Sequence, residues 1–151
     1  MAASGGPYLL MAVLCERAQQ DQYGSFSVMN VLEQLVAGTD SPDAPEKMPT
    51  FRFQGSLAIQ FASGKAAGDH TLSVVPIEPA GTRLDAVSQV IRLKGDDHRA
   101  TFVSNVSMDI TDEGVYWFEV SLNRRVVTRI PLKIRYERSY VQPWSAYVLE
   151  H

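Results

Sequence analysis

The fold class is decided by Asp112-Glu113-Gly114-Val115-Tyr116-Trp117-Phe118-Glu119-Val120. An acidic turn leads into a segment in which large apolar residues recur at every second position. Side chains two positions apart point to the same side of a β-strand, so the pattern predicts a strand that enters a hydrophobic core. The stretch therefore indicates an architecture, and it does not by itself indicate a reaction.

The same alternation recurs along most of the chain. Leu57, Ile59 and Phe61, for example, share one face of a predicted strand. Segments rich in Gly, Asn, Asp and Pro separate these stretches, as turns do between short strands. We expect an all-β fold, a two-sheet antiparallel β-sandwich of about eight strands that is immunoglobulin-like or C2-like. The predicted strands lie near residues 7–15, 25–32, 50–62, 69–77, 84–93, 98–110, 114–122 and 126–137.

Three local features modify this predicted arrangement of strands. Val31, Leu32, Leu35 and Val36 share a short apolar stripe, so one helical turn could follow the second strand. The segment Gly38–Pro49 has the composition of an exposed, mobile connection. Pro131 lacks a backbone N–H, which predicts a sheet edge or a bulge at that point of the last strand.

Length and charge limit the classes of protein to consider. A chain of 151 residues fits one domain, which we place at 1–137. We expect it to be followed by an aromatic C-terminal tail at 138–148 and a tag remnant at 149–151. The chain has 14 basic and 17 acidic residues, for a net charge of -3, with no basic cluster. Because binding to a phosphate backbone requires concentrated Lys and Arg, we expect no nucleic-acid partner.

Cysteine content and hydropathy bear on location. Cys15 is the single cysteine, so no intramolecular disulfide can form and a reducing, cytoplasmic location is favoured. The apolar run Tyr8–Cys15 is preceded by no Lys or Arg, which argues against an export signal. The run is also far shorter than the ~20 residues that cross a bilayer, so we expect no membrane partner.

Two resemblances support the sandwich. Asp112, Gly114 and Tyr116 have the spacing found at the tyrosine corner of immunoglobulin-like domains, where the tyrosine hydroxyl binds nearby backbone; Phe118 stands where antibody domains have a cysteine. More broadly, Tyr8–Tyr136 resembles a family of small bacterial β-sandwich proteins, a domain of unknown function. The resembling segments are Leu10–Ala18, Gly24–Val31, Asp112–Val120 and Arg129–Leu132. This resemblance implies the fold and a bacterial source, and it implies no catalytic residue.

Few residues suggest chemistry. His70 lies beside Asp69, and His98 follows Asp96 and Asp97, but no spacing supplies two nitrogen or sulfur ligands for zinc. We therefore interpret His70 and His98 as surface residues in turns. No Gly-x-Ser-x-Gly motif presents a nucleophile, although a hydrolytic triad can be dispersed along a chain.

Calcium is an alternative ligand. Asp109, Asp112 and Glu113, with Asp96 and Asp97, would offer oxygen ligands, but they lack a full calcium-loop motif. We therefore assign no catalytic, cofactor-binding or metal-binding residue and no cofactor.

Aromatic residues suggest binding. Trp117 points away from Tyr116 and Phe118; it could form a sugar platform, but packing under another element is favoured. Tyr140, Trp144 and Tyr147 in the tail require cover, either from this domain or from another chain.

We thus expect a non-catalytic binding or assembly module whose partner is a protein or a second copy of itself. Self-association through an edge strand or the tail is the most concrete version. A carbohydrate-binding module and a calcium-dependent binding module are the alternatives.

Overall fold

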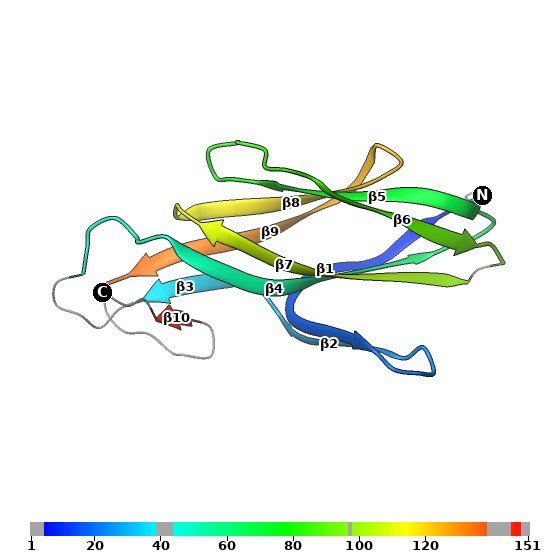
Figure 1. Ribbon diagram of the computed structural model, residues 1–151, viewed down its shortest axis with the longest axis horizontal. Coiled ribbons are helices and arrows are strands. Elements are labelled where there is room, and N and C mark those ends of the chain that lie inside the picture. The colour runs from blue at the N-terminus through cyan, green and yellow to red at the C-terminus, as the bar shows by residue number, and fades with distance from the viewer. Residues whose placement is uncertain (1–4, 39–43, 97, 139–145, 149–151) are drawn as a thin grey trace.

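The alternating segments form two stacked sheets in the computed structural model, which describes residues 5–38, 44–96, 98–138 and 146–148 (Figure 1). One sheet has four strands in the order β2-β1-β4-β7, and the other has six in the order β10-β3-β9-β8-β5-β6. The described residues contain no helix, and hence no apolar helix of membrane-spanning length. The strands are β1 (Tyr8–Gln20), β2 (Phe26–Val31), β3 (Gln34–Gly38), β4 (Phe51–Ala62), β5 (Ala67–Ile77), β6 (Val87–Lys94), β7 (Arg99–Ile110), β8 (Gly114–Leu122), β9 (Arg125–Glu137) and β10 (Ala146–Val148).

The core lies between the sheets and is built from the predicted alternation. Tyr116, Phe118 and Val120 of β8 point inward and are fully buried, as are Phe53 and Ile59 of β4. Burying a large apolar side chain contributes roughly 1.5–3 kcal/mol, so these inward rows hold the two layers together. The all-β, two-sheet prediction is confirmed; each predicted strand forms, within three residues of its expected bounds except for β1, which continues to Gln20 beyond its predicted end at residue 15.

The helical turn predicted over Asn30–Val36 is wrong. Asn30 has a positive φ of 55°, β2 ends at Val31, and β3 begins at Gln34 in the other sheet. Leu35, Val36 and Ala37 are all buried, because β3 lies inside the six-stranded sheet. A short run of buried residues has no period that distinguishes a strand from a helix, and this explains the error.

The predicted antiparallel pairing also needs a correction at one side of the larger sheet. β3 runs parallel to β9, and β10 runs parallel to β3. The remaining strand pairs are antiparallel, including the long β4–β7 ladder from Phe51–Ile110 to Ala62–Arg99. The chain therefore changes sheets between β2 and β3, and the backbone of 146–148 adds the last strand. Of the tail rings, Tyr140 and Trp144 lie outside the described residues.

Pro131 lies in a part of β9 that is paired with β8 on one side and with no described strand on the other. The backbone N–H of Lys133 donates to Glu33 at 3.1 Å, and β3 pairs with β9 only from Lys133 onward. Alternate residues of a strand point their N–H groups the same way, so the nitrogen of Pro131 faces the side that β3 has not yet reached. The edge prediction is thus correct for this half of β9, although its other half is a central strand.

The second half of the Gly38–Pro49 connection is exposed at residues 45–47, as predicted, but the residues on either side of this stretch are packed. Ala44 and Met48 are buried. The carbonyl of Pro45 accepts a hydrogen bond from the Tyr136 hydroxyl at 2.8 Å, and the carbonyl of Ala44 accepts one from Arg138 at 2.7 Å. The composition of the segment is that of a loop, but its apolar residues cover the end of β9. Residues 39–43 lie outside the described part.

Candidate functional site

A groove opens between β6 and β7, which are edge strands of the two different sheets. It holds a volume of about 320 Å³. The sheets face each other here without a strand that closes the gap between them, so the core can be reached from the side. Its lining residues are Leu57, Val74, Pro76, Leu84, Asp85, Val87, Phe102, Ser104, Asn105, Val106, Ser107, Met108 and Phe118.

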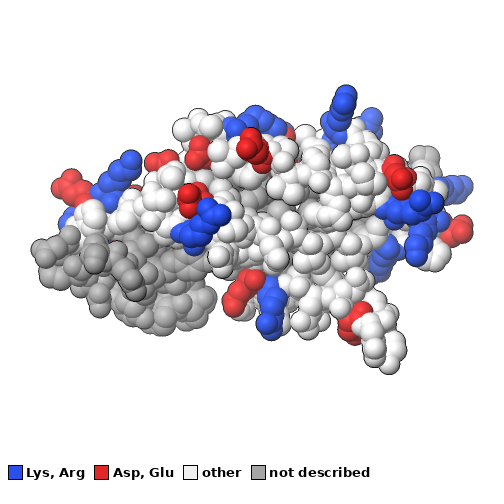
Figure 2. Space-filling view, viewed as in Figure 1, with Lys and Arg blue, Asp and Glu red and all other residues white. Residues whose placement is uncertain are grey.

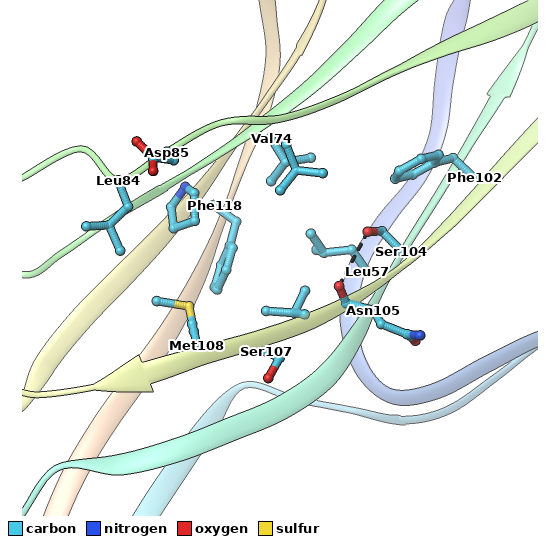
Figure 3. Close-up of a pocket in the computed structure, with 13 residues that line it drawn as sticks. Leu57, Val74, Leu84, Asp85, Phe102, Ser104, Asn105, Ser107, Met108 and Phe118 are labelled. Carbon is cyan, nitrogen blue, oxygen red and sulfur yellow. Dashed lines mark hydrogen bonds between the residues drawn. The ribbon is translucent and has the colours of Figure 1, made fainter.

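The groove has an apolar floor and a polar rim. Figure 3 shows Leu57, Val74, Met108 and Phe118 projecting into the space between the sheets. The polar side chains of the groove are those of Ser104 and Asp85, whereas the side chains of Asn105 and Ser107 bond Ser56 and Arg52 on the other face of the sheet. An apolar cavity with a few polar groups is common in binding sites. The groove is therefore suited to holding an apolar group.

The outer edge of β7 beside this groove is paired with no described strand, although the carbonyl of Asn105 accepts a hydrogen bond from the Ser104 hydroxyl at 3.5 Å. The N–H of Ser63 donates to the carbonyl of His98 at 2.7 Å, in the same register as the β4–β7 ladder. Because N–H and C=O groups alternate between the two sides of a strand, the even-numbered residues of β7 point theirs toward β4. The odd-numbered residues from Arg99 to Asp109 point theirs outward, where no described strand pairs with them.

This edge carries few of the features that block strand addition. Natural edges are commonly protected by proline, by a bulge or by a charge that points inward. β7 contains no proline, and the β4–β7 ladder has no register shift. Its inward side chains are Ala100, Phe102, Ser104, Val106 and Met108. In Figure 2, the centre of the face viewed is largely free of charged side chains, which lie around it at the ends and along the upper and lower margins.

Trp117 lies on the opposite surface of the larger sheet and corrects a prediction. We expected it to be packed under another element, but it is 39% exposed. It is flanked in the sheet by Ile77 of β5 and Pro131 of β9. The second sheet covers only the side of Tyr116 and Phe118, so the other face of β8 is exposed at Trp117, although Glu119 on that face is buried by its neighbours.

An ion-pair cluster lies next to Trp117. The carboxylate of Glu119 accepts hydrogen bonds from Arg83 at 2.7 Å and from Arg129 at 3.0 Å. The Glu119 side chain is only 9% exposed, while both arginines are more than half exposed. The hydrogen bond from Arg83 is the main cause that lowers the pKa of Glu119, so the carboxylate stays charged. The same contact raises the pKa of Arg83.

His70 and His98 each contact a different set of neighbouring groups. The ring of His70 is 2.7 Å from the Asn123 amide and 3.2 Å from the carbonyl of Ala67. The ring of His98 is 3.0 Å from the carbonyl of Gly95, at the turn before β7. His70 lies in β5 and not in a turn.

The acidic residues considered as calcium ligands are used in other contacts. Asp109 pairs with Arg52 at 3.0 Å, and the Thr111 hydroxyl donates to Asp112 at 3.1 Å. Glu113 accepts the backbone N–H of Tyr136 at 2.8 Å. Within the described residues, no group of three or more His, Cys, Asp or Glu is close enough to hold a metal ion. Asp97 lies outside the described part.

Sequence reasoning missed the groove and the Glu119 cluster. The groove depends on which strands become sheet edges, and a single sequence does not give strand order. A signal for the cluster exists: Glu119 is an acidic residue on the outer face of a predicted strand, and Arg129 faces it across the β8–β9 ladder. Opposite charges on facing positions are a common cross-strand pair.

The comparisons with known proteins identify a family. No curated protein matches the chain. One similar solved structure is an immunoglobulin-like protein from Pseudomonas aeruginosa, with 14% sequence identity and a TM-score of 0.33, and the match covers 83% of this chain and 97% of that one. A family model matches residues 10–135, which is most of the chain. The chain therefore belongs to DUF6941, a family of unknown function.

Proposed function

We propose that this protein is a non-catalytic assembly module that binds an extended polypeptide strand along the open edge of β7. The observation that carries the proposal is the row of outward backbone groups on the odd-numbered residues of β7, which lies beside an apolar groove. An added strand would satisfy these N–H and C=O groups, and the groove would accept its inward apolar side chains.

The direct test uses a peptide that is unrelated in sequence to this chain. The probe is a soluble peptide of alternating threonine and valine with a lysine at each end, titrated into dilute, monomeric protein. Chemical-shift changes in the backbone amides of β7, strongest at odd-numbered residues, are the expected result. An absence of shifts along Arg99–Ile110 at millimolar peptide contradicts the proposal.

Val103→Pro supplies a selective variant for this test. Val103 is an odd-numbered, exposed residue, so its N–H lies outside the β4–β7 ladder and proline removes only an outward donor. We expect Val103→Pro to abolish the peptide-induced shifts while the protein remains folded. Val103→Ala is the matched control, because it shortens the same side chain and keeps the N–H.

The exposure of Trp117 favours a second candidate function, carbohydrate binding. A half-open indole ring beside Arg83, Glu119 and Arg129 provides a flat apolar surface with polar groups at its side. Soluble neutral and uronic-acid oligosaccharides can be titrated while Trp117 fluorescence is followed in a Trp144→Phe background. A saturable change that Trp117→Ala removes would support this function, and an unchanged signal across the panel would argue against it.

A further inference from the structure

We infer that the strand bound by β7 is β7 of a second copy, paired antiparallel about a two-fold axis beside Ser104; this rests on the proposed strand binding. The first argument is charge. Arg99 and Asp109 are the ionisable residues of β7, and they lie at its two ends, at equal distance along the chain from Ser104. An antiparallel pair centred on Ser104 places each Arg99 opposite Asp109 of the second copy, at both ends of the interface.

The backbone permits this register. Strand pairs formed by exchanged hydrogen bonds must join residues whose N–H and C=O groups point outward, which here are the odd-numbered ones. The register centred on Ser104 joins odd residues to odd residues throughout. Arg99 faces Asp109, Thr101 faces Ser107, and Val103 faces Asn105 of the second copy. The hydrogen-bond pattern allows every register that is centred on a residue of β7, and among these the charge pairing selects the one centred on Ser104.

The inward side chains of β7 are compatible with the register centred on Ser104. Phe102 would face Val106 of the second copy, and Ala100 would face Met108, so the inward pairs join apolar residues. Phe102, Val106 and Met108 also line the groove, and the added strand would extend this apolar surface over its open side. Thr101, Asn105 and Ser107 would form polar pairs on the solvent face.

The two charged ends are available for this contact. Arg99 is exposed and forms no ion pair with any described residue. The side chain of Asp109 is 62% exposed, and one of its carboxylate oxygens forms an ion pair with Arg52. Facing charges of opposite sign on an antiparallel pair are favourable, and like charges there are destabilising.

The test is a charge exchange measured by sedimentation velocity. Arg99→Asp alone places two carboxylates together at each end, and Asp109→Arg alone places two guanidinium groups there. We expect each variant to weaken self-association roughly tenfold. In an equimolar mixture every facing pair between the two variants is again of opposite charge, so we expect the mixture to form a heterodimer near wild-type affinity. Mixing that leaves both variants monomeric overturns the inference.

Cysteine cross-linking reads the register directly. The single native cysteine, Cys15, is buried, so an introduced cysteine is the only exposed thiol. In the proposed register Ser104 faces itself, and Ser104→Cys should form an intermolecular disulfide under mild oxidation. Val103→Cys, the control, lies diagonally across from its own copy and should not.

The outcomes separate this inference from the proposed function. Peptide-induced shifts along β7 in a protein that stays monomeric at all accessible concentrations would retain strand binding and refute the second copy as the partner. A Val103→Cys disulfide without a Ser104→Cys disulfide would refute the register. A dimer that persists in Val103→Pro with unchanged affinity would refute the β7 interface itself.

Discussion

The hydroxyl of Tyr116 accepts a hydrogen bond from the backbone N–H of Thr111 at 3.0 Å, inside the turn that precedes β8. The N–H of Asp112 points at the same oxygen, at 3.3 Å. Tyr116 is fully buried, so its ring packs in the core while its oxygen holds the turn closed. One side chain therefore ties the stability of the core to the conformation of the β7–β8 connection.

Tyr116→Phe should lower the free energy of unfolding by roughly 1–3 kcal/mol, because the ring is kept and the partly buried N–H groups lose their acceptor. Urea denaturation monitored by circular dichroism measures the change. The strand-binding edge should be unaffected, since β7 keeps its ladder with β4. A variant as stable as the wild type would show that water replaces the hydroxyl at no cost.

Gly114 begins β8 with a φ of +124°, and a Cβ there would lie 2.9 Å from Cβ of Pro79. Gly114→Ala should therefore destabilise the fold by more than the ~1–3 kcal/mol expected from backbone strain alone. Gly68→Ala is the matched control, because Gly68 also has a positive φ, +90°, but its Cβ would meet nothing within 4 Å. The melting temperatures of the two variants compare the loss of stability from backbone strain alone, at Gly68, with the loss from strain plus the contact with Pro79, at Gly114. Equal losses would show that Pro79 moves aside.

Strand β8, strand β3 and the groove show how much of the structure can be predicted from the sequence. Alternation around Tyr116 and Phe118 predicts the strand, the buried face and the preceding turn, because a core strand in a sandwich imposes a period of two. It does not predict β3, since Leu35, Val36 and Ala37 are buried together and leave no period to detect. Nor does it predict the site: the groove exists because β6 and β7 become edges, and that order arises from pairings between distant segments.

Glu119 links stability to pH through its two arginines. Its pKa is lowered in the folded protein, mainly by the hydrogen bond from Arg83, whereas the pKa of a glutamate in an unfolded chain is about 4.3. A lowered folded pKa means that the stabilisation is fully present above the unfolded pKa and is lost as the pH falls through the folded value.

Glu119→Gln should consequently destabilise the protein by about 1 kcal/mol at pH 7, a value kept small because both arginines are more than half exposed. The difference from wild type should shrink as the pH is lowered below about 4. Denaturant titrations of both proteins from pH 7 to pH 3 measure it. A difference that stays constant over this range would mean that packing, and not charge, makes the contribution of Glu119.

Cys15 should be inert in the folded protein. Its side chain is fully buried on β1, its sulfur is 3.5 Å from the carbonyl of Ser56, and burial raises the pKa of the thiol. A thiolate, and not a thiol, attacks disulfide reagents, so both access and ionisation oppose the reaction. We expect an aromatic disulfide reagent to label native protein only as fast as the β1–β4 region opens, and to label urea-unfolded protein at once. Immediate labelling of native protein would contradict this and would mean that the β1–β4 pairing, at the centre of the four-stranded sheet, exchanges with an open form.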